Sequence, residues 1–204
     1  MEQFDLFGTT SGNNELTKLT NGEYLYLPDF FSQAQATGYL NAFNDTIDWK
    51  QEEMQLYGKL VKFPRLTAWY GDDDKPYSFS GIKLNPKPWN KELLEIKTKI
   101  EPRCETTFNS VLLNYYRDGN DSISWHTDAE KELGINPLIA SVNFGAARKF
   151  QLRHRDTKEK IELILQHGSL LIMKGELQHF WQHQVPKTKT AVKERINLTF
   201  RVIK

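Results

Sequence analysis

Cysteine, long apolar runs and net charge are all scarce in this sequence. The single cysteine, Cys104, can close no intrachain disulfide and cannot by itself build a zinc or iron–sulfur site, which predicts a reducing, intracellular environment. Hydrophobic residues make up 39% and charged residues 26%, which excludes a membrane protein, a collagen-like fibre and a disordered polymer. Because 27 Lys and Arg nearly balance 26 Asp and Glu, a wholesale polyelectrolyte binder is excluded too. The 204 residues therefore predict one soluble globular domain.

The first residues lack the features of an export signal. An acid stands on each side of Phe4 and no long apolar stretch follows, so the sequence predicts neither a signal peptide nor a transit peptide. We expect a protein that is not secreted and that resides in the bacterial cytoplasm or, in a eukaryote, in the nucleus. We also expect a monomer with no membrane partner.

Turn residues and apolar spacing divide the chain. Residues 1–20 are loosely composed and predict a flexible N-terminal segment, whereas residues 21–204 form one predicted domain. Apolar residues recur at helical spacing over 33–44 and 91–101, with Ser32 and Asn90 as helix caps.

After Thr107, short segments rich in β-branched and aromatic residues alternate with turns. The predicted strands are 109–117, 121–128, 138–144, 148–154, 160–165, 169–174, 180–185 and 194–203. The chain thus predicts a mainly β fold with flanking helices, of the α+β class. A sandwich or barrel with jelly-roll-like connections fits this order, and its wide mouth between sheets can hold a small ligand.

Positive charge is concentrated between Arg148 and Lys160, where six cations accompany two acids. The run has two interpretations: a ridge that faces phosphates, or a solvated hairpin, which is the more common origin of such a pattern.

Three separated side chains have the chemistry of an iron site. Side chains alternate along a strand, so His126 and Asp128 in the segment 121–128 share a face. His183 offers a further imidazole. Two neutral nitrogens and one carboxylate form the facial triad that suits non-haem Fe(II) and leaves positions open for substrates, whereas a closed structural zinc site usually has a fourth protein ligand. Because His-x-Asp occurs by chance in many proteins, the surrounding pattern has to support this hypothesis.

The C-terminal strand separates polar from apolar side chains. Ile196, Leu198 and Phe200 take one face, and the other carries Arg195, Asn197, Thr199 and Arg201. At about 3.3 Å per residue the two arginines stand about 20 Å apart, so they can bracket an elongated dianion but cannot both stack on one carboxylate. A solvent-exposed basic strand edge is the alternative.

Asn114 and Tyr116 share a face of the predicted strand 109–117. Both can donate hydrogen bonds to the same dianion, although Tyr116 also fits the role of a core aromatic residue.

With these residues in place, about residues 56–204 resemble the AlkB family of Fe(II)/2-oxoglutarate dioxygenases, and in particular the branch that repairs duplex DNA. Besides the residues above, the resemblance is carried by Pro64–Arg65, Tyr70–Asp72, Tyr77–Gly81, Pro86–Trp89, Leu113–Tyr116, Ser141–Gly145 and His167–Leu170. It implies a double-stranded β-helix (jelly-roll) core over about 107–204 and an N-terminal nucleotide-recognition lid over about 50–90. It also implies that His183, rather than the nearby His179, is the third iron ligand.

The resemblance further implies an activity and its cofactors. The dianion becomes 2-oxoglutarate, held by Asn114, Tyr116, Arg195, Thr199 and Arg201 with Asn197 nearby. The reaction becomes Fe(II)- and O2-dependent removal of a methyl group from 1-methyladenine- or 3-methylcytosine-type bases in double- or single-stranded DNA, with release of formaldehyde, succinate and CO2. The alternatives are an oxygenase acting on RNA, free nucleotide or protein, and a nucleic-acid-binding module without catalysis.

A methylated base in a duplex must be flipped out to reach the iron. In their Tyr-Ser-Phe-Ser-Gly context, Tyr77 and Phe79 resemble the walls that stack on such a base, although composition alone makes them core aromatics. Tyr57 resembles the wedge that fills the resulting gap. Arg65 and Glu130 are further candidates for the base pocket.

The N-terminal residues Gln3–Phe7 resemble the short peptides that dock on bacterial sliding clamps. Gln3 offers an amide for a pocket rim, and Leu6 and Phe7 offer two apolar anchors. The alternative is a terminus whose Leu6 and Phe7 fold back onto the domain.

Overall fold

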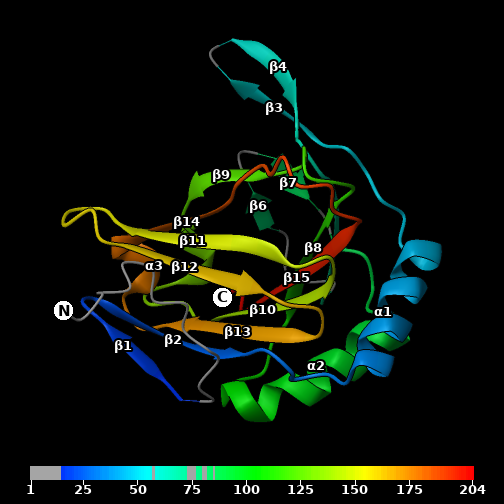
Figure 1. The fold of residues 1–204 in the computed structure, drawn as a ribbon, viewed down its shortest axis with the longest axis horizontal. Coiled ribbons are helices and arrows are strands. Elements are labelled where there is room, and N and C mark those ends of the chain that lie inside the picture. The colour runs from blue at the N-terminus through cyan, green and yellow to red at the C-terminus, as the bar shows by residue number, and fades with distance from the viewer. Residues whose placement is uncertain (1–14, 57, 73–76, 80–81, 85) are drawn as a thin grey trace, which may run out of the picture.

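A computed structural model describes residues 15–56, 58–72, 77–79, 82–84 and 86–204 (Figure 1). The helices are α1 (Gln33–Thr46), α2 (Lys91–Cys104) and α3 (Leu177–Phe180), with a 3-10 turn at Lys131–Leu133. The strands are β1 (Thr17–Leu19), β2 (Gly22–Leu27), β3 (Glu53–Leu56), β4 (Lys59–Lys62), β5 (Leu66–Gly71), β6 (Tyr77–Phe79), β7 (Ile82–Leu84), β8 (Ser110–Tyr116), β9 (Ile123–His126), β10 (Ile139–Gly145), β11 (Arg148–His154), β12 (Lys160–Leu165), β13 (Ser169–Lys174), β14 (Trp181–Val185) and β15 (Arg195–Arg201).

Two antiparallel sheets form the body of the protein. The larger has the order β1-β2-β13-β10-β15-β8-β5, and the smaller has the order β12-β11-β14-β9. A shared apolar core that includes Leu112, Phe150, Met173 and Trp181 lies between them. This arrangement confirms the predicted mainly β fold with a double-stranded β-helix core.

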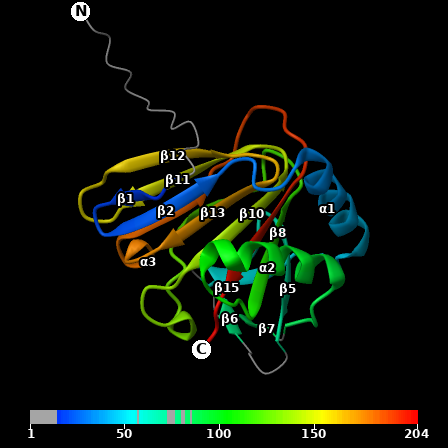
Figure 2. The same ribbon diagram turned by 90° about the horizontal axis from the view of Figure 1, so that it is seen from below.

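Helices α1 and α2 cover the outer face of the larger sheet (Figure 2). The predicted caps are confirmed: the Ser32 hydroxyl accepts a hydrogen bond from the Gln35 amide, and Asn90 Oδ1 accepts one from the Leu93 amide at 2.9 Å. A second apolar core lies between these helices and the sheet. The apolar face of β15 packs in it, since Ile196 and Leu198 are fully buried there. The opposite face of β15 is thereby directed between the sheets.

The ordered sheet begins earlier than the sequence predicted. β1 lies inside the segment 1–20, yet it pairs with β2, which in turn pairs with β13. Asn21, with φ of 55°, makes the turn between the two strands. The residues before it are mostly polar, which is why the sequence predicted a flexible segment there. Residues 1–14, with Gln3, Leu6 and Phe7, lie outside the described residues.

The segment 50–90, predicted as a lid, is divided in the structure. β5 is a strand of the larger sheet and pairs with β8 along its length. The β3–β4 hairpin instead projects from the body (Figure 1), and β6 and β7 form a second small hairpin. No helix among the described residues is long and apolar enough to span a membrane.

Candidate active site

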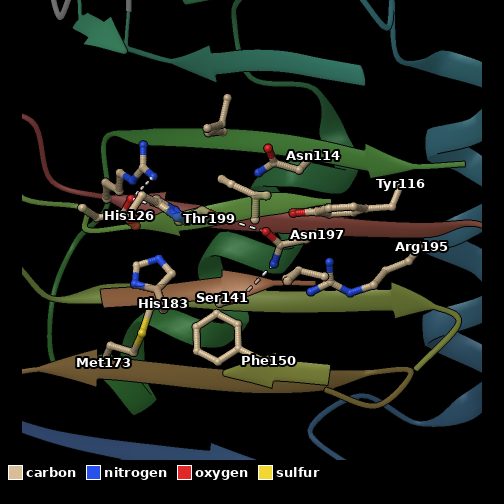
Figure 3. Close-up of a pocket in the computed structure, with 15 residues that line it drawn as sticks. Asn114, Tyr116, His126, Ser141, Phe150, Met173, His183, Arg195, Asn197 and Thr199 are labelled. Atoms are coloured by element: carbon tan, nitrogen blue, oxygen red, sulfur yellow. Dashed lines mark hydrogen bonds and ion pairs between the residues drawn. The ribbon is translucent and has the colours of Figure 1, made fainter. Parts of the chain in front are cut away.

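One pocket between the sheets gathers every metal and cosubstrate residue that the sequence predicted. Figure 3 shows these side chains converging from strands of both sheets. The lining residues are Leu112, Asn114, Tyr116, Ile123, His126, Asp128, Ser141, Phe150, Met173, His183, Val185, Arg195, Asn197, Thr199 and Arg201. The polar face of β15 is therefore the floor of a pocket and not an exposed basic edge.

His126, Asp128 and His183 meet at one end of this pocket. One ligand atom from each lies within 4.8 Å of the others, a spacing at which a single metal ion can contact all three. β9 and β14 pair with His126 opposite His183, and the two ring centroids are 4.2 Å apart. The predicted convergence is correct, but the strand ends at His126. Asp128 lies in the following loop, so strand alternation does not account for its position.

Asp128 is ionised and held from two sides. Its carboxylate accepts a hydrogen bond from Arg201 Nη2 at 2.9 Å, and its backbone N–H donates to Gln178 Oε1 at 2.9 Å. Burial raises the pKa of Asp128, but the Arg201 guanidinium and the neighbouring His183 and His126 together outweigh it, and the pKa falls to about 2. Asp128 therefore offers a carboxylate throughout the physiological pH range.

The two histidines are neutral, as metal ligands must be. Burial, reinforced by the neighbouring His126, lowers the pKa of His183 to about 3. Burial also lowers the pKa of His126. His126 Nδ1 lies 2.8 Å from the Ser124 carbonyl, which can only accept, so Nε2 keeps its lone pair and faces the Asp128 carboxylate at 3.9 Å. Two neutral imidazoles and a carboxylate are a donor set that fits Fe(II).

The charge state of His183 predicts how stability responds to pH. Between about pH 6.5 and about pH 3, the unfolded chain protonates this imidazole and the folded protein does not. Stability of the metal-free protein should hence be level above about pH 6.5 and fall as pH decreases through that window. Urea unfolding midpoints at pH 5 and 7.5, with a chelator present, measure the slope. A His183→Gln variant should show a smaller change of stability with pH. An identical change in the variant and the wild type would contradict the neutral state of His183 in the folded protein.

Arg195 lies at the other end of the pocket from His126 and His183 (Figure 3). Its side chain is 1% exposed, and its Nη2 donates to Asn143 Oδ1. The guanidinium also lies 4.9 Å from the centre of the Tyr116 ring. No described residue accepts a hydrogen bond from its Nε or Nη1, and no described carboxylate pairs with it. A buried guanidinium in this state is complementary to an anionic ligand.

Polar contacts between strands orient the residues around this end. Asn197 Nδ2 donates to Ser141 Oγ at 2.8 Å, and the Thr199 hydroxyl donates to Asn197 Oδ1 at 3.1 Å. Asn197 therefore belongs to the support of the pocket. Ser141 and Asn143, which the sequence does not mark as site residues, come from β10 and are brought to β15 by strand pairing.

Arg65 supports the pocket from behind. It is 4% exposed and does not line the cavity, and its Nε donates to Asn114 Oδ1 at 2.7 Å. With its oxygen occupied, Asn114 presents its amide nitrogen as a donor, which agrees with the predicted contact to a carboxylate.

The other predicted base-pocket residues are placed only in part. Glu130 is half-buried and lies two residues after Asp128. Tyr77 and Phe79 belong to β6, but their side chains lie outside the described part of the chain, as does the whole of Tyr57.

The cations between Arg148 and Lys160 do not form one ridge. Arg148 is 3% exposed and donates to the carbonyl oxygens of Asp118, Asp121 and Pro186, at 3.1, 2.9 and 2.7 Å respectively. The phosphate-facing interpretation is wrong for Arg148, which instead ties together the loops before β9 and after β14. The other five cations belong to the β11–β12 hairpin, as the second interpretation stated, and all of them except the half-buried Arg153 are exposed.

Comparison with known proteins agrees with this geometry. The model of the 2OG-Fe(II) oxygenase superfamily matches residues 23–201. The mouse protein "alpha-ketoglutarate-dependent dioxygenase alkB homolog 3" is 40% identical over 186 residues, which cover 86% of this chain and 64% of the relative. Human "DNA oxidative demethylase ALKBH2" is 43% identical over 158 residues, which cover 74% of this chain and 60% of the relative. The chain thus spans less than two thirds of the length of these relatives.

A solved structure titled "The structure of OsALKBH1" has a similar fold. It superposes with a TM-score of 0.65 at 16% identity and covers 91% of this chain and 100% of its own.

Proposed function

Because the chain belongs to the 2OG-Fe(II) oxygenase superfamily, we propose that it repairs DNA by demethylating N-alkylated bases of the 1-methyladenine and 3-methylcytosine type. The observation that carries the proposal is one pocket with a His-Asp-His triad at one end and the buried Arg195 at the other. Relatives named as a DNA oxidative demethylase and as an alkB homolog support the choice of reaction and substrate.

One group of pocket residues is suited to bind the metal, and another is suited to bind the cosubstrate. His126, Asp128 and His183 would hold Fe(II), and Arg195 with Tyr116 and Asn114 would bind 2-oxoglutarate. Together with O2, bound Fe(II) and 2-oxoglutarate would supply the oxidising power to hydroxylate a methyl group, with conversion of 2-oxoglutarate to succinate and CO2, and the hydroxymethyl product would then release formaldehyde. Arg201 keeps Asp128 ionised. Burial of all these residues except His126 limits water around the metal and the cosubstrate and holds both in orientation.

The loop between β14 and β15 supports a nucleic-acid substrate. Lys187, Lys189 and Lys193 are exposed there, and none of them forms an ion pair with a described residue. The loop connects the strand of His183 to the strand of Arg195. It is anchored to the loop before β9, because the Thr188 amide donates to the Gly119 carbonyl at 2.9 Å. Exposed, unpaired cations beside a pocket are suited to contact phosphates.

Removal of two of these lysines should weaken DNA binding in a salt-dependent way. Each lysine that contacts a phosphate contributes about 1 to the slope of log K against log salt, so a Lys187→Ala, Lys189→Ala double variant should lose up to about 2 of this slope. Fluorescence anisotropy with a methylated oligonucleotide at several salt concentrations measures it. Lys18→Ala, Lys91→Ala removes two exposed lysines from β1 and α2 as a matched control. Equal slopes for both double variants would contradict the role of the loop.

The activity itself is tested by succinate formation. The purified protein with Fe(II), 2-oxoglutarate and O2 should form succinate and formaldehyde when 1-methyladenine or 3-methylcytosine oligonucleotides are added, and much less with unmethylated ones. If succinate and formaldehyde form only with methylated RNA, nucleotide or peptide, that molecule and not DNA is the substrate. If they form with none of these, the protein is a nucleic-acid-binding module without catalysis.

Further parts of the proposal rest on the sequence. Tyr57 is the wedge for duplex substrates, Tyr77 and Phe79 stack on the flipped base, and Glu130 contacts it. Through Gln3, Leu6 and Phe7 the protein docks on a bacterial sliding clamp. It works as a monomer in the bacterial cytoplasm or, in a eukaryote, in the nucleus.

A further inference from the structure

The position of Asp128 needs a cause that the sheet does not supply. β9 ends at His126, and Asp128 lies beyond the last ladder hydrogen bond of that strand. The Arg201 contact fixes the carboxylate, but it involves only the tip of the side chain. A second contact is required to fix the backbone from which the carboxylate extends.

Gln178 makes that second contact. Its side chain is fully buried, and its Oε1 accepts the hydrogen bond of the Asp128 amide at 2.9 Å across 50 residues of sequence. Its Nε2 contacts the weak acceptor Met173 Sδ at 3.7 Å, so the amide oxygen is turned toward the Asp128 backbone. Gln178 does not line the pocket and is separate from the predicted ligands.

The helix that carries Gln178 is held in place by its own contacts. It belongs to α3, whose Leu177 is fully buried against Gly22 of β2, where an added Cβ would lie 2.9 Å from Leu177 Cα. Directly after α3, Trp181 Nε1 donates to the Thr20 carbonyl at 2.9 Å. The short helix is thereby attached to the β1–β2 turn and cannot shift freely.

α3 also leads directly into β14, the strand of His183. The same four-residue helix therefore fixes the start of the strand that carries His183 and, through Gln178, the backbone of Asp128. His179 adds a contact to the loop after Asp128, since its Nε2 lies 3.2 Å from the Asn136 amide. This explains why His179 is close to the triad in sequence without being part of it.

We propose that Gln178 is a positioning residue for the metal site, holding Asp128 at the distance from His183 that a metal ion requires. The inference rests on the proposed iron site. Loss of its acceptor oxygen would leave the buried Asp128 amide unsatisfied and free the carboxylate to follow Arg201 alone. Residues that orient metal ligands from outside the coordination sphere typically contribute about 10- to 100-fold in metal affinity.

The test is Co(II) binding to the full-length metal-free protein, followed by visible absorption. Gln178→Met keeps the volume and removes the acceptor, so its Kd for Co(II) should rise about 10- to 100-fold, with an altered ligand-field spectrum. Gln178→Asn keeps the amide but is one methylene too short, so its Kd for Co(II) should also rise. This variant replaces Gln178→Met in the test if Gln178→Met does not fold. Asn90→Ala is the matched control, because it deletes another side-chain bond to a backbone N–H, at the cap of α2.

The outcomes distinguish a failure of the metal site from a failure of the role of Gln178. Co(II) affinity within twofold of wild type in both Gln178 variants overturns the proposal, as does an equal loss in Asn90→Ala, which would indicate general loosening. His183→Ala decides the underlying site: if it too leaves Co(II) affinity unchanged, the triad assignment fails. If it abolishes binding while the Gln178 variants bind normally, only the role of Gln178 fails.

Discussion

Alanine at His126, Asp128 or His183 is expected to abolish turnover, because each substitution removes one of three protein ligands of the iron site. Single-turnover and steady-state assays of succinate and formaldehyde on a methylated oligonucleotide measure the effect. Near-normal demethylation by any one of the purified variants would reject the triad.

The three variants should differ in stability, which provides the control for folding. The side chain of His126 is 26% exposed, so its loss should disturb the core least and gives the clearest test of chemistry. Asp128→Ala instead leaves the Arg201 guanidinium, 2% exposed, without this carboxylate. Breaking a buried pair in this way costs about 3–5 kcal/mol of the free energy of unfolding. Circular dichroism and urea titration of the metal-free variants therefore have to accompany the assay.

Replacement of Arg195 is expected to act in opposite directions on cosubstrate binding and on stability. A lost charge-assisted contact to a carboxylate costs about 1.5–3 kcal/mol, so Arg195→Met should raise the 2-oxoglutarate requirement about 10- to 150-fold. The same change removes a buried guanidinium that has no described carboxylate partner, so the ligand-free protein should keep or gain stability. 2-Oxoglutarate titrations of turnover and urea unfolding without cosubstrate measure the two effects.

Arg201 serves as the comparison, because its guanidinium contacts the candidate metal ligand Asp128. Arg201→Ala should raise both the 2-oxoglutarate requirement and the metal requirement, whereas Arg195→Met should raise only the former. If Arg201→Ala leaves the 2-oxoglutarate requirement unchanged, the idea that two arginines bracket the dianion is wrong. Lys160→Met, at an exposed hairpin position, should change neither quantity.

The sequence predicted best where a local pattern repeats. In β15 the alternation from Arg195 to Arg201 determined both the core face and the pocket face, because a pleated strand allows no other division. Ser32 and Asn90 marked the two long helices for a similarly local reason, since a cap acts within three residues.

Contacts between distant segments could not be predicted in this way. α3 has four residues, too few to show helical periodicity, and it was included in a predicted strand and its preceding loop. Gln178 and Asn143 act on partners 50 and 52 residues away, and nothing in their neighbours marks them. Arg148 was placed among surface cations, because its burial depends on three carbonyl oxygens from two other loops.

The central place of β15 has a consequence for how this chain can vary. One residue inserted or deleted between Arg195 and Arg201 would shift the pairing with β10 and β8 and turn every later side chain to the opposite face. Aliphatic groups would then enter the pocket, and charged groups would enter the core under α1 and α2. A point substitution in β15 alters one side chain, but a change in its length would remove the binding site and the core together.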